Sequence, residues 1–169
     1  FVAAEVARVE VMAPPLIVRL VGRPPRLDAG ASYARLCMAY AVARTLQNGA
    51  LDLTDFRGTA LADAATHDLA SRVETRDDGT TDPNALAPQT VVVHLRDGRA
   101  FRWRCDTMLA HPARPLTRDQ HLEKFRRCLA FSAQPLAAGA ETHLIEAADR
   151  LEEMADVRAL AALACSPLR

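Results

Sequence analysis

The sequence predicts an α+β fold, in which a small antiparallel sheet is covered by helices and followed by a C-terminal helical tail. Three observations support this fold class. Residues 5–12 alternate between apolar and charged side chains, residues 89–105 have the composition of a β-hairpin, and residues 32–47 repeat apolar side chains at helical spacing. Strands and helices follow one another in mixed order, which is typical of helices layered on an antiparallel sheet.

The first element is a strand over residues 5–12. Its side chains alternate with the period of a half-buried strand, and the apolar side consists of Ala7, Val9 and Val11. Four prolines follow, at positions 14, 15, 24 and 25, and they interrupt regular structure. We therefore expect residues 13–29 to form an irregular connection.

The clearest helix covers residues 32–47. Ser32 provides an N-terminal cap, and Asn48-Gly49 provides a C-terminal stop. Two faces of this helix are largely apolar, and they consist of Leu36, Tyr40, Ala43 and Gln47 on one side and Met38, Val42 and Leu46 on the other. A helix that is apolar nearly all round is buried on several sides, so we expect it at the centre of the fold.

Two short elements are predicted between this helix and the hairpin. A second helix covers about residues 60–71, and a short strand follows at Val73-Glu74-Thr75. Residues 76–88 are polar and rich in turn-forming residues, so we expect them to form an exposed loop.

The hairpin at residues 89–105 turns at Asp97-Gly98, and its register follows from the length of the turn. A three-residue loop, with Gly98 in the left-handed conformation, pairs Val93 with Phe101. A two-residue turn would place Val93 opposite Arg102 instead. Because the three-residue loop keeps one face of the hairpin apolar, we predict that register.

The C-terminal part of the chain is predicted to be helical. Thr117 and Gln120 form a capping box that opens a helix through about Phe131, with an inner face of Leu122, Phe125 and Leu129. A break around Gln134-Pro135 and Gly139 precedes two more helices, at about residues 142–154 and 156–164. One stripe of the first of these consists of Leu144, Ala148, Leu151 and Ala155.

Charge and hydropathy exclude several classes of function. The chain has 169 residues, with 21 basic and 21 acidic side chains. Nucleic-acid binders carry a clustered basic excess, and none occurs here, so we expect no nucleic-acid partner. No apolar run reaches the length of a membrane span and no signal peptide opens the chain, so we expect a cytoplasmic protein with no membrane partner.

The cysteines and histidines give no metal pattern. The four cysteines, Cys37, Cys105, Cys128 and Cys165, are widely spaced and lie among apolar neighbours. No two of them have C-x-x-C spacing, and no histidine follows or precedes a cysteine at the sequence spacing of metal ligands, so we expect no metal site. We expect four buried thiols in a reducing compartment. Nucleotide-binding, zinc-protease and serine-hydrolase motifs are also absent from the sequence.

Five stretches form a pattern along nearly the whole chain. They are Ala34 to Ala43 with Leu46 and Gly49; Asp55-Phe56; Val91-Val92-Val93 with Asp97-Gly98-Arg99; His111 to Leu116 with Lys124-Phe125; and Leu151-Glu152 with Asp156-Val157 and Leu160. In this order they resemble the MmgE/PrpD family, which includes cofactor-independent 2-methylcitrate dehydratases. The first stretch is similar to the family's lid helix, the third to its hairpin, and the fourth to its lid-closing loop.

The resemblance implies a division of the chain. Residues 1–128 correspond to the family's α+β lid domain, and residues 129–169 to helices that return to a large helical domain preceding the lid. It implies that the chain is part of a longer protein, a homodimer at full length, and that most of the family's catalytic histidines and lysines precede Phe1. The resemblance implies no metal or organic cofactor.

The implied reaction is the removal of water from 2-methylcitrate or a related small polycarboxylate, in propionate metabolism. Two alternatives within the same family, an epimerase and a decarboxylase, stay open at the level of sequence. A third alternative is a non-catalytic, free-standing lid module that binds a partner chain. In each case we expect the 169-residue chain alone to show no turnover.

Tyr40 and Arg35 are the first two candidate site residues. Tyr40 matches a tyrosine of the family's lid helix that points at the active-site cleft, which implies a catalytic role for its phenol as a hydrogen-bond or proton donor. The alternative is a buried core tyrosine whose hydroxyl is satisfied by the protein. Arg35, about 140° around the predicted helix from Tyr40, is a candidate ligand for a substrate carboxylate, or else a partner in a surface ion pair.

His111 is the third candidate, in a loop flanked by Pro112 and Pro115. Its imidazole either binds the substrate or anchors the loop. The sequence departs from the family pattern at Cys37, where a serine is common, at Ala110, where a glycine often precedes the His-Pro pair, and at Arg114, where an asparagine is frequent. The changed loop at residues 110–114 indicates a different substrate, or a member whose activity has drifted.

Overall fold

The computed structural model describes residues 1–133 and 135–165, and they fall into two compact units. The first unit is Phe1–Pro115 and the second is Leu116–Arg169. The predicted division at residue 128 concerns which helices return to another domain, and the structure does not test it. The expected break at Gln134 and the last four residues of the predicted 129–169 segment lie outside the described residues.

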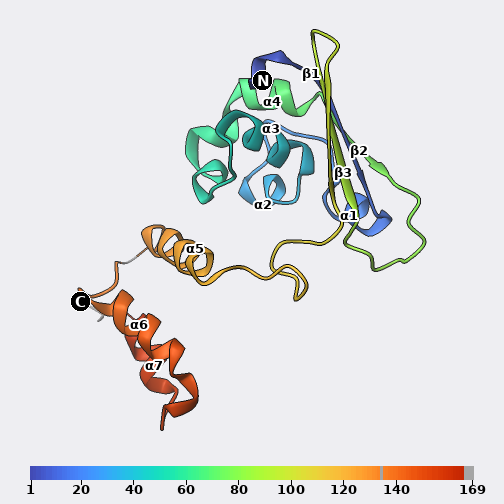
Figure 1. Ribbon diagram of the computed structural model, residues 1–169. Coiled ribbons are helices and arrows are strands. Elements are labelled where there is room, and N and C mark those ends of the chain that lie inside the picture. The colour runs from blue at the N-terminus through green and yellow to red at the C-terminus, as the bar shows by residue number, and fades with distance from the viewer. Residues whose placement is uncertain (134, 166–169) are drawn as a thin grey trace. The chain divides into compact units, whose positions relative to one another are not determined.

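The first unit is built on a mixed four-stranded sheet in the order β2-β1-β3-β4 (Figure 1). The strands are β1 (Val6–Ala13), β2 (Val73–Asp77), β3 (Gln89–Leu95) and β4 (Ala100–Cys105). The predicted α+β class is confirmed, but the sheet is not purely antiparallel because β2 runs parallel to β1. A parallel pair requires a long crossover, and residues 14–72, which hold most of the helices of this unit, supply it.

The strand predicted at residues 5–12 is confirmed, but its apolar side is partly wrong. Val9 and Val11 are buried as expected, whereas Ala7 is exposed and Val6 is buried in its place. The register of β1 against β3 shifts between Val6 and Arg8. This β-bulge adds a residue to one strand and inverts the alternation of side chains before it.

The β3–β4 hairpin has the predicted register. Val93 pairs with Phe101 and Val91 with Trp103, and Gly98 has a φ of 88°. The loop at residues 78–88 is mostly exposed, also as expected, although β2 extends to Asp77. The left-handed turn at Gly98 therefore sets the register of the hairpin, and the register decides which β4 side chains lie on the core-facing side of the sheet.

We expect Gly98→Ala to lower the free energy of unfolding by about 1–2 kcal/mol, because a side chain at positive φ clashes with the neighbouring carbonyl. The matched control is Gly30→Ala, since Gly30 has a φ of −73° and an added Cβ there meets no atom within 4 Å. Urea denaturation of both variants measures the difference. Equal stability of the two variants would contradict the left-handed turn.

The connection expected to be irregular at residues 13–29 contains a helix, α1 (Pro15–Val21). The prediction is confirmed for Pro24 and Pro25, which lie in irregular structure after α1, and it was wrong for Pro15, which occupies the first helical position. There the missing N–H removes no hydrogen bond, and the fixed φ suits a helix. Pro14 precedes the helix in an extended conformation.

The single helix predicted over residues 32–47 is two helices, α2 (Ala31–Ala34) and α3 (Met38–Asn48). Cys37 between them is extended, with φ −114° and ψ 103°, and it forms a β-bridge with Gly22. The N-terminal cap is Gly30 rather than Ser32, whereas Gly49 ends α3 in the left-handed conformation as predicted. The bridge to Gly22 is a tertiary contact that helical periodicity does not encode.

The helix predicted at residues 60–71 is confirmed in part as α4 (Ala64–Ala70). Asp63 starts it, because its carboxylate accepts hydrogen bonds from the amides of Ala65 and Thr66. Two short 3-10 helices, Leu53–Phe56 and Gly58–Ala62, lie between α3 and α4 in the chain. Residues 52–62 thus form a connecting segment without a long helix of its own.

Helices α2, α3 and α4 lie on one face of the sheet (Figure 1). The core between them contains many aliphatic side chains, among them Val6, Val9, Val11, Ala43, Leu69, Ala70, Val73 and Val93. The apolar residues of β4 on this face are not enclosed, since Phe101 is 44% exposed and Trp103 is 56% exposed. Phe1 stacks on Phe101 with ring centroids 5.1 Å apart.

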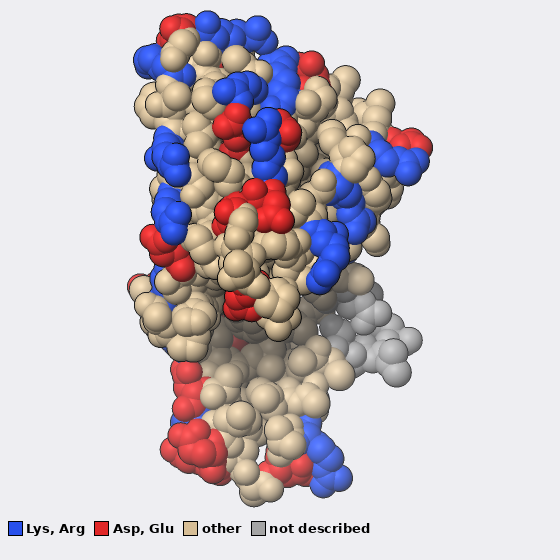
Figure 2. All heavy atoms as spheres, turned by 90° about the vertical axis from the view of Figure 1, so that its right-hand side faces the viewer, with Lys and Arg blue, Asp and Glu red and all other residues tan. Residues whose placement is uncertain are grey.

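The opposite face of the sheet carries charged side chains of both signs. Arg8 pairs with Glu10 on β1, and Arg76 pairs with Glu74 on β2. The space-filling view from this side shows acidic and basic residues interspersed (Figure 2). This mixture offers no continuous basic surface on the face that is seen.

The described residues of the second unit form three helices, α5 (Arg118–Ala130), α6 (Ala140–Asp149) and α7 (Arg158–Ala164), with a 3-10 turn at Leu151–Glu153. The predicted capping box is confirmed, as the Thr117 hydroxyl accepts from the Gln120 amide and the Gln120 side chain accepts from the Thr117 amide. Ion pairs of Arg118 with Asp149 and of Arg126 with Glu141 join α5 to α6.

The described residues of this unit form a very small core. Ala140 and Leu144 are its buried apolar residues. The other members of the predicted stripe, Ala148, Leu151 and Ala155, are exposed. Cys128 and Cys165 are exposed too, so the expectation of four buried thiols holds only for Cys37 and Cys105. In the described part of the chain, no helix is long and apolar enough to cross a membrane.

Candidate functional site

Tyr40, the first predicted site residue, lies on α3 with only 2% of its surface exposed. Its ring packs between two others, with centroids 5.9 Å from Phe56 and 5.8 Å from His67. The His67 ring is held by a 2.8 Å hydrogen bond between Nε2 and the Leu61 carbonyl. The tyrosine is therefore enclosed by the connecting segment 52–62 and by α4.

The Tyr40 hydroxyl is directed at the backbone of the connecting segment. It lies 2.5 Å from the carbonyl oxygen of Asp55 and 3.0 Å from that of Ala60. A phenol has one proton, so it donates to one of these carbonyls at a time. Burial raises the pKa of the Tyr40 phenol. The negative charges of Asp55 and Asp63 raise this pKa further, and the positive charge of Arg44 lowers it. The phenol therefore stays protonated at neutral pH.

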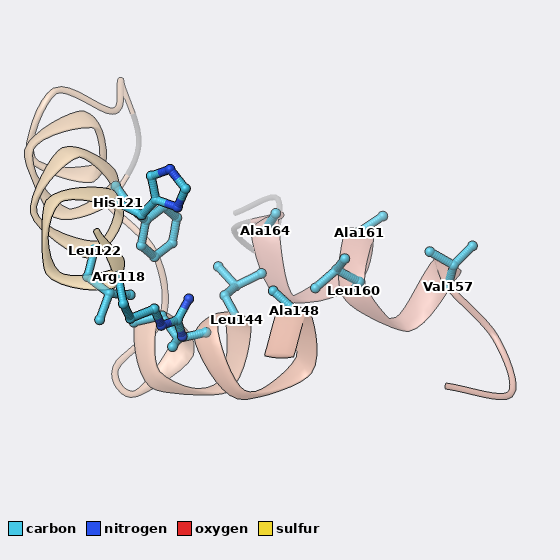
Figure 3. A pocket seen from close by; sticks show the side chains of 11 residues that line it. Arg118, His121, Leu122, Leu144, Ala148, Val157, Leu160, Ala161 and Ala164 are labelled. Atoms are coloured by element: carbon cyan, nitrogen blue, oxygen red, sulfur yellow. The ribbon is translucent and has the colours of Figure 1, made fainter. Parts of the chain in front are cut away.

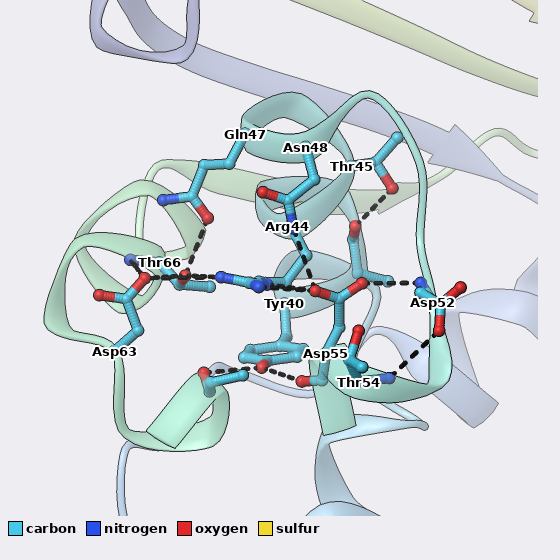
Figure 4. Close-up of polar contacts among 12 residues, drawn as sticks. Tyr40, Arg44, Thr45, Gln47, Asn48, Asp52, Thr54, Asp55, Asp63 and Thr66 are labelled. Carbon is cyan, nitrogen blue, oxygen red and sulfur yellow. Dashed lines mark hydrogen bonds and ion pairs between the residues drawn. The ribbon is translucent and has the colours of Figure 1, made fainter. Parts of the chain in front are cut away.

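An ion pair between Arg44 and Asp55 lies beside this hydroxyl (Figure 4). The Arg44 guanidinium donates to Asp55 Oδ1 from Nε at 2.9 Å and from Nη2 at 2.6 Å. The Asn48 amide donates to the same oxygen at 3.0 Å, and the Asp52 backbone N–H donates to Oδ2 at 2.7 Å. The Asp55 side chain is buried, with 3% exposed, and the Arg44 side chain is largely buried, with 15% exposed.

The remaining nitrogen of Arg44 reaches the start of α4. Nη1 donates to the Thr66 hydroxyl at 3.2 Å and lies 3.6 Å from Asp63 Oδ2. A hydrogen bond from the Thr66 hydroxyl, with further ones from the Ala65 and Thr66 amides, holds the pKa of the Asp63 carboxyl below its ordinary value. Gln47 also contacts Thr66 at 2.8 Å. One arginine thus ties α3, the connecting segment and α4 together.

Arg35, the second predicted residue, is exposed. Because α2 ends at Ala34 and Cys37 is extended, the helical offset of about 140° from Tyr40 does not apply. The Arg35 guanidinium instead lies 5.9 Å from the centroid of the Phe56 ring. Since Phe56 also packs on Tyr40, one aromatic ring contacts both predicted residues.

His111, the third predicted residue, is exposed in the loop that follows β4. Its Nδ1 accepts a 3.1 Å hydrogen bond from the Ala113 amide, so Nε2 carries the proton in the neutral ring. Ala110 has a φ of 71°, a left-handed conformation that glycine adopts most readily. Arg114 donates to the Thr107 carbonyl at 3.0 Å and closes the loop.

The structure brings Arg35 and Tyr40 together and leaves His111 apart. Among the described residues, no hydrogen bond, ion pair or ring contact joins His111 to either of them. The proposed roles of the three in catalysis and binding stay predictions. The described part of the chain contains no group of three His, Cys, Asp or Glu side chains arranged to hold a metal ion.

The sequence-based prediction missed Arg44, Asp63 and Thr66. Arg44 stands four residues after Tyr40, and Gln47 and Asn48 stand seven and eight after it, so all four share one helical stripe. Polar side chains on a face expected to be buried signal a need for buried partners. The partners come from residues 52–66, whose proximity the sequence pattern does not show.

A search of curated proteins gives no match. Comparison with protein families matches residues 2–152 to the MmgE/PrpD C-terminal domain. The match extends from the start of the first unit into the helices of the second, and it covers most of the 169 residues. The chain therefore belongs to the MmgE/PrpD family, whose C-terminal domain it carries.

Proposed function

We propose that this chain is the lid portion of a lyase that removes water from 2-methylcitrate or a related small polycarboxylate, without a metal or organic cofactor. The observation that carries the proposal is the family match over residues 2–152. In the dehydration, a base removes the proton α to a carboxylate while cationic groups stabilise the developing charge and an acid protonates the departing hydroxyl.

Arg35 and His111 are the proposed substrate contacts on this chain. Both are exposed, and both can donate hydrogen bonds to a carboxylate. The stacking of Arg35 on Phe56 limits the directions its guanidinium can take, which suits it to orient an anion. His111 is limited in the same way by the hydrogen bond from Ala113.

Tyr40 is proposed to act indirectly, by supporting the residues that contact the substrate. Its hydroxyl is already engaged by two backbone carbonyls, and its ring supports the Phe56 on which Arg35 stacks. Direct proton donation to the substrate would require the connecting segment 52–62 to leave α3. We therefore assign Tyr40 a positioning role, and the earlier prediction of proton donation becomes the competing hypothesis.

The second unit is proposed to pack against the helical domain of the same protein. An open cavity of about 440 Å³ lies between α5, α6 and α7 (Figure 3). Its walls are almost entirely apolar, with Leu122, Phe125, Leu144 and Leu160 among the lining residues and Arg118 and His121 on the α5 side. Apolar side chains from another helix would complete the core that this unit lacks. The homodimer expected for the full-length protein also belongs to this proposal.

Product analysis tests the proposed function. We expect the longer protein that contains this chain with a helical domain to convert 2-methylcitrate or citrate to the unsaturated acid, detected by proton NMR of the reaction mixture. Residues 1–169 alone are expected to convert neither substrate, because most of the proposed catalytic machinery lies elsewhere.

Other products would replace the proposal with a different one. Inversion of a stereocentre without loss of water identifies an epimerase, and release of carbon dioxide identifies a decarboxylase. Turnover by residues 1–169 alone contradicts the assignment of this chain as a lid. A complete absence of turnover, together with tight binding of a partner chain, supports the non-catalytic module.

A further inference from the structure

We propose that Arg44 and Asp55 are positioning residues for Tyr40: their ion pair fixes the connecting segment 52–62 on α3, and with it the surroundings of the Tyr40 hydroxyl. The significance of this placement for turnover rests on the proposed function. The placement itself is measurable without any substrate, so the two ideas can fail separately.

Asp55 links the ion pair to the tyrosine through one residue. Its carboxylate accepts from Arg44, Asn48 and the Asp52 amide, while its backbone carbonyl accepts from the Tyr40 hydroxyl. A carboxylate with that many donors has a single favourable orientation. Because side chain and carbonyl belong to the same residue, holding the carboxylate also holds the acceptor of the tyrosine.

Few apolar side chains of the connecting segment pack against α3 and hold the segment there. Phe56 is the buried apolar residue of the connecting segment, and Leu61 is partly buried against the core. Leu53 is exposed, as is Leu51 just before the segment. Besides the packing of Phe56, the polar contacts of Arg44, Asp55 and Tyr40 therefore attach residues 52–62 to α3.

The charges around the Tyr40 phenol make the proposal measurable. Arg44 comes from α3, Asp55 from the connecting segment and Asp63 from the start of α4, which also contributes the His67 ring. Arg44 lowers the pKa of the phenol, whereas Asp55 and Asp63 raise it. Removing one partner of the ion pair leaves the charge of the other, so the two removals act on the tyrosine in opposite senses.

The sequence offers a clean probe, since Tyr33 and Tyr40 are its two tyrosines. In a Tyr33→Phe background, the alkaline change in ultraviolet absorbance reports Tyr40 alone. We expect Asp55→Asn to move this titration to lower pH and Arg44→Gln to move it to higher pH. Arg76→Gln, which breaks an exposed ion pair on β2 of the same unit, is the matched control and should leave the titration unchanged.

Circular dichroism at each pH establishes that the variant is still folded when the tyrosine ionises. If a variant unfolds before Tyr40 ionises, amide hydrogen exchange near neutral pH tests the attachment of the connecting segment instead. We then expect roughly tenfold faster exchange across residues 52–62 and little change in β1 and β3. Titrations that move in the same direction, or not at all, overturn the proposal. Exchange that is unchanged in residues 52–62, or that rises equally over the whole unit, overturns it as well.

Discussion

Replacing Asp55 by alanine is expected to lower the free energy of unfolding by about 3–5 kcal/mol, because it leaves a buried arginine without its main partner. Arg44 is 15% exposed and cannot recover full hydration in place. The Asn48 amide and the Asp52 N–H lose their acceptor at the same time. Urea denaturation followed by circular dichroism measures the loss.

The matched control is Asp68→Ala. Asp68 also pairs with an arginine, Arg72, but 65% of its side chain is exposed. Exposed pairs contribute up to about 1 kcal/mol, and Arg72 keeps its hydrogen bond to the Val6 carbonyl. A loss for Asp55→Ala no greater than that of the control would show that the Arg44 network does not hold the first unit together.

Tyr40→Ala is expected to cost about 3–5 kcal/mol, since it removes a fully buried aromatic ring from between Phe56 and His67. Tyr40→Phe keeps the ring and loses the hydroxyl, so about 1 kcal/mol is expected for that variant. Thermal denaturation of the two variants separates the contribution of the ring from that of the hydrogen bond.

Tyr33→Phe controls for the loss of a phenol elsewhere in the unit. The Tyr33 hydroxyl donates to the Pro24 carbonyl at 2.8 Å, in an exposed loop where water can replace it. We expect this variant to be as stable as the parent within about 0.5 kcal/mol. If Tyr40→Ala were tolerated equally well, Tyr40 would not be a core residue of the first unit.

Local patterns predicted the local structures well. The Asp97-Gly98 turn gave the register of the hairpin, and Thr117 with Gln120 gave the start of α5. In both places the residues that decide the structure are neighbours in the chain. The same holds for Gly49, whose left-handed conformation ends α3 where the sequence indicated.

Tertiary contacts account for the errors. Cys37 leaves the helical conformation because it pairs with Gly22, and β2 joins β1 in parallel across a crossover of about 60 residues. The β-bulge at Val6 to Arg8 depends on pairing with β3. Periodicity describes one element at a time, so none of these arrangements is visible in it.

The candidate site shows the same limit. The sequence identified Tyr40, and its buried location and satisfied hydroxyl match the structural alternative considered for it. Arg44 was missed because a single arginine on a helix is usually solvated. Its burial depends on Asp55 and Asp63, which reach it only once residues 52–66 fold back over α3.

The turnover of Tyr40→Phe distinguishes a positioning role of Tyr40 from direct proton donation to the substrate. In the longer protein with its helical domain, kcat and KM for the substrate identified by product analysis are compared between the parent and Tyr40→Phe. The proposed positioning role, in which Tyr40 supports Phe56 and through it Arg35, predicts a fall in kcat/KM of less than about tenfold, together with the modest loss of stability given above. A fall in kcat of about 100-fold or more, the size typical of lost general-acid catalysis, would show that the phenol reaches the substrate and would contradict the positioning role.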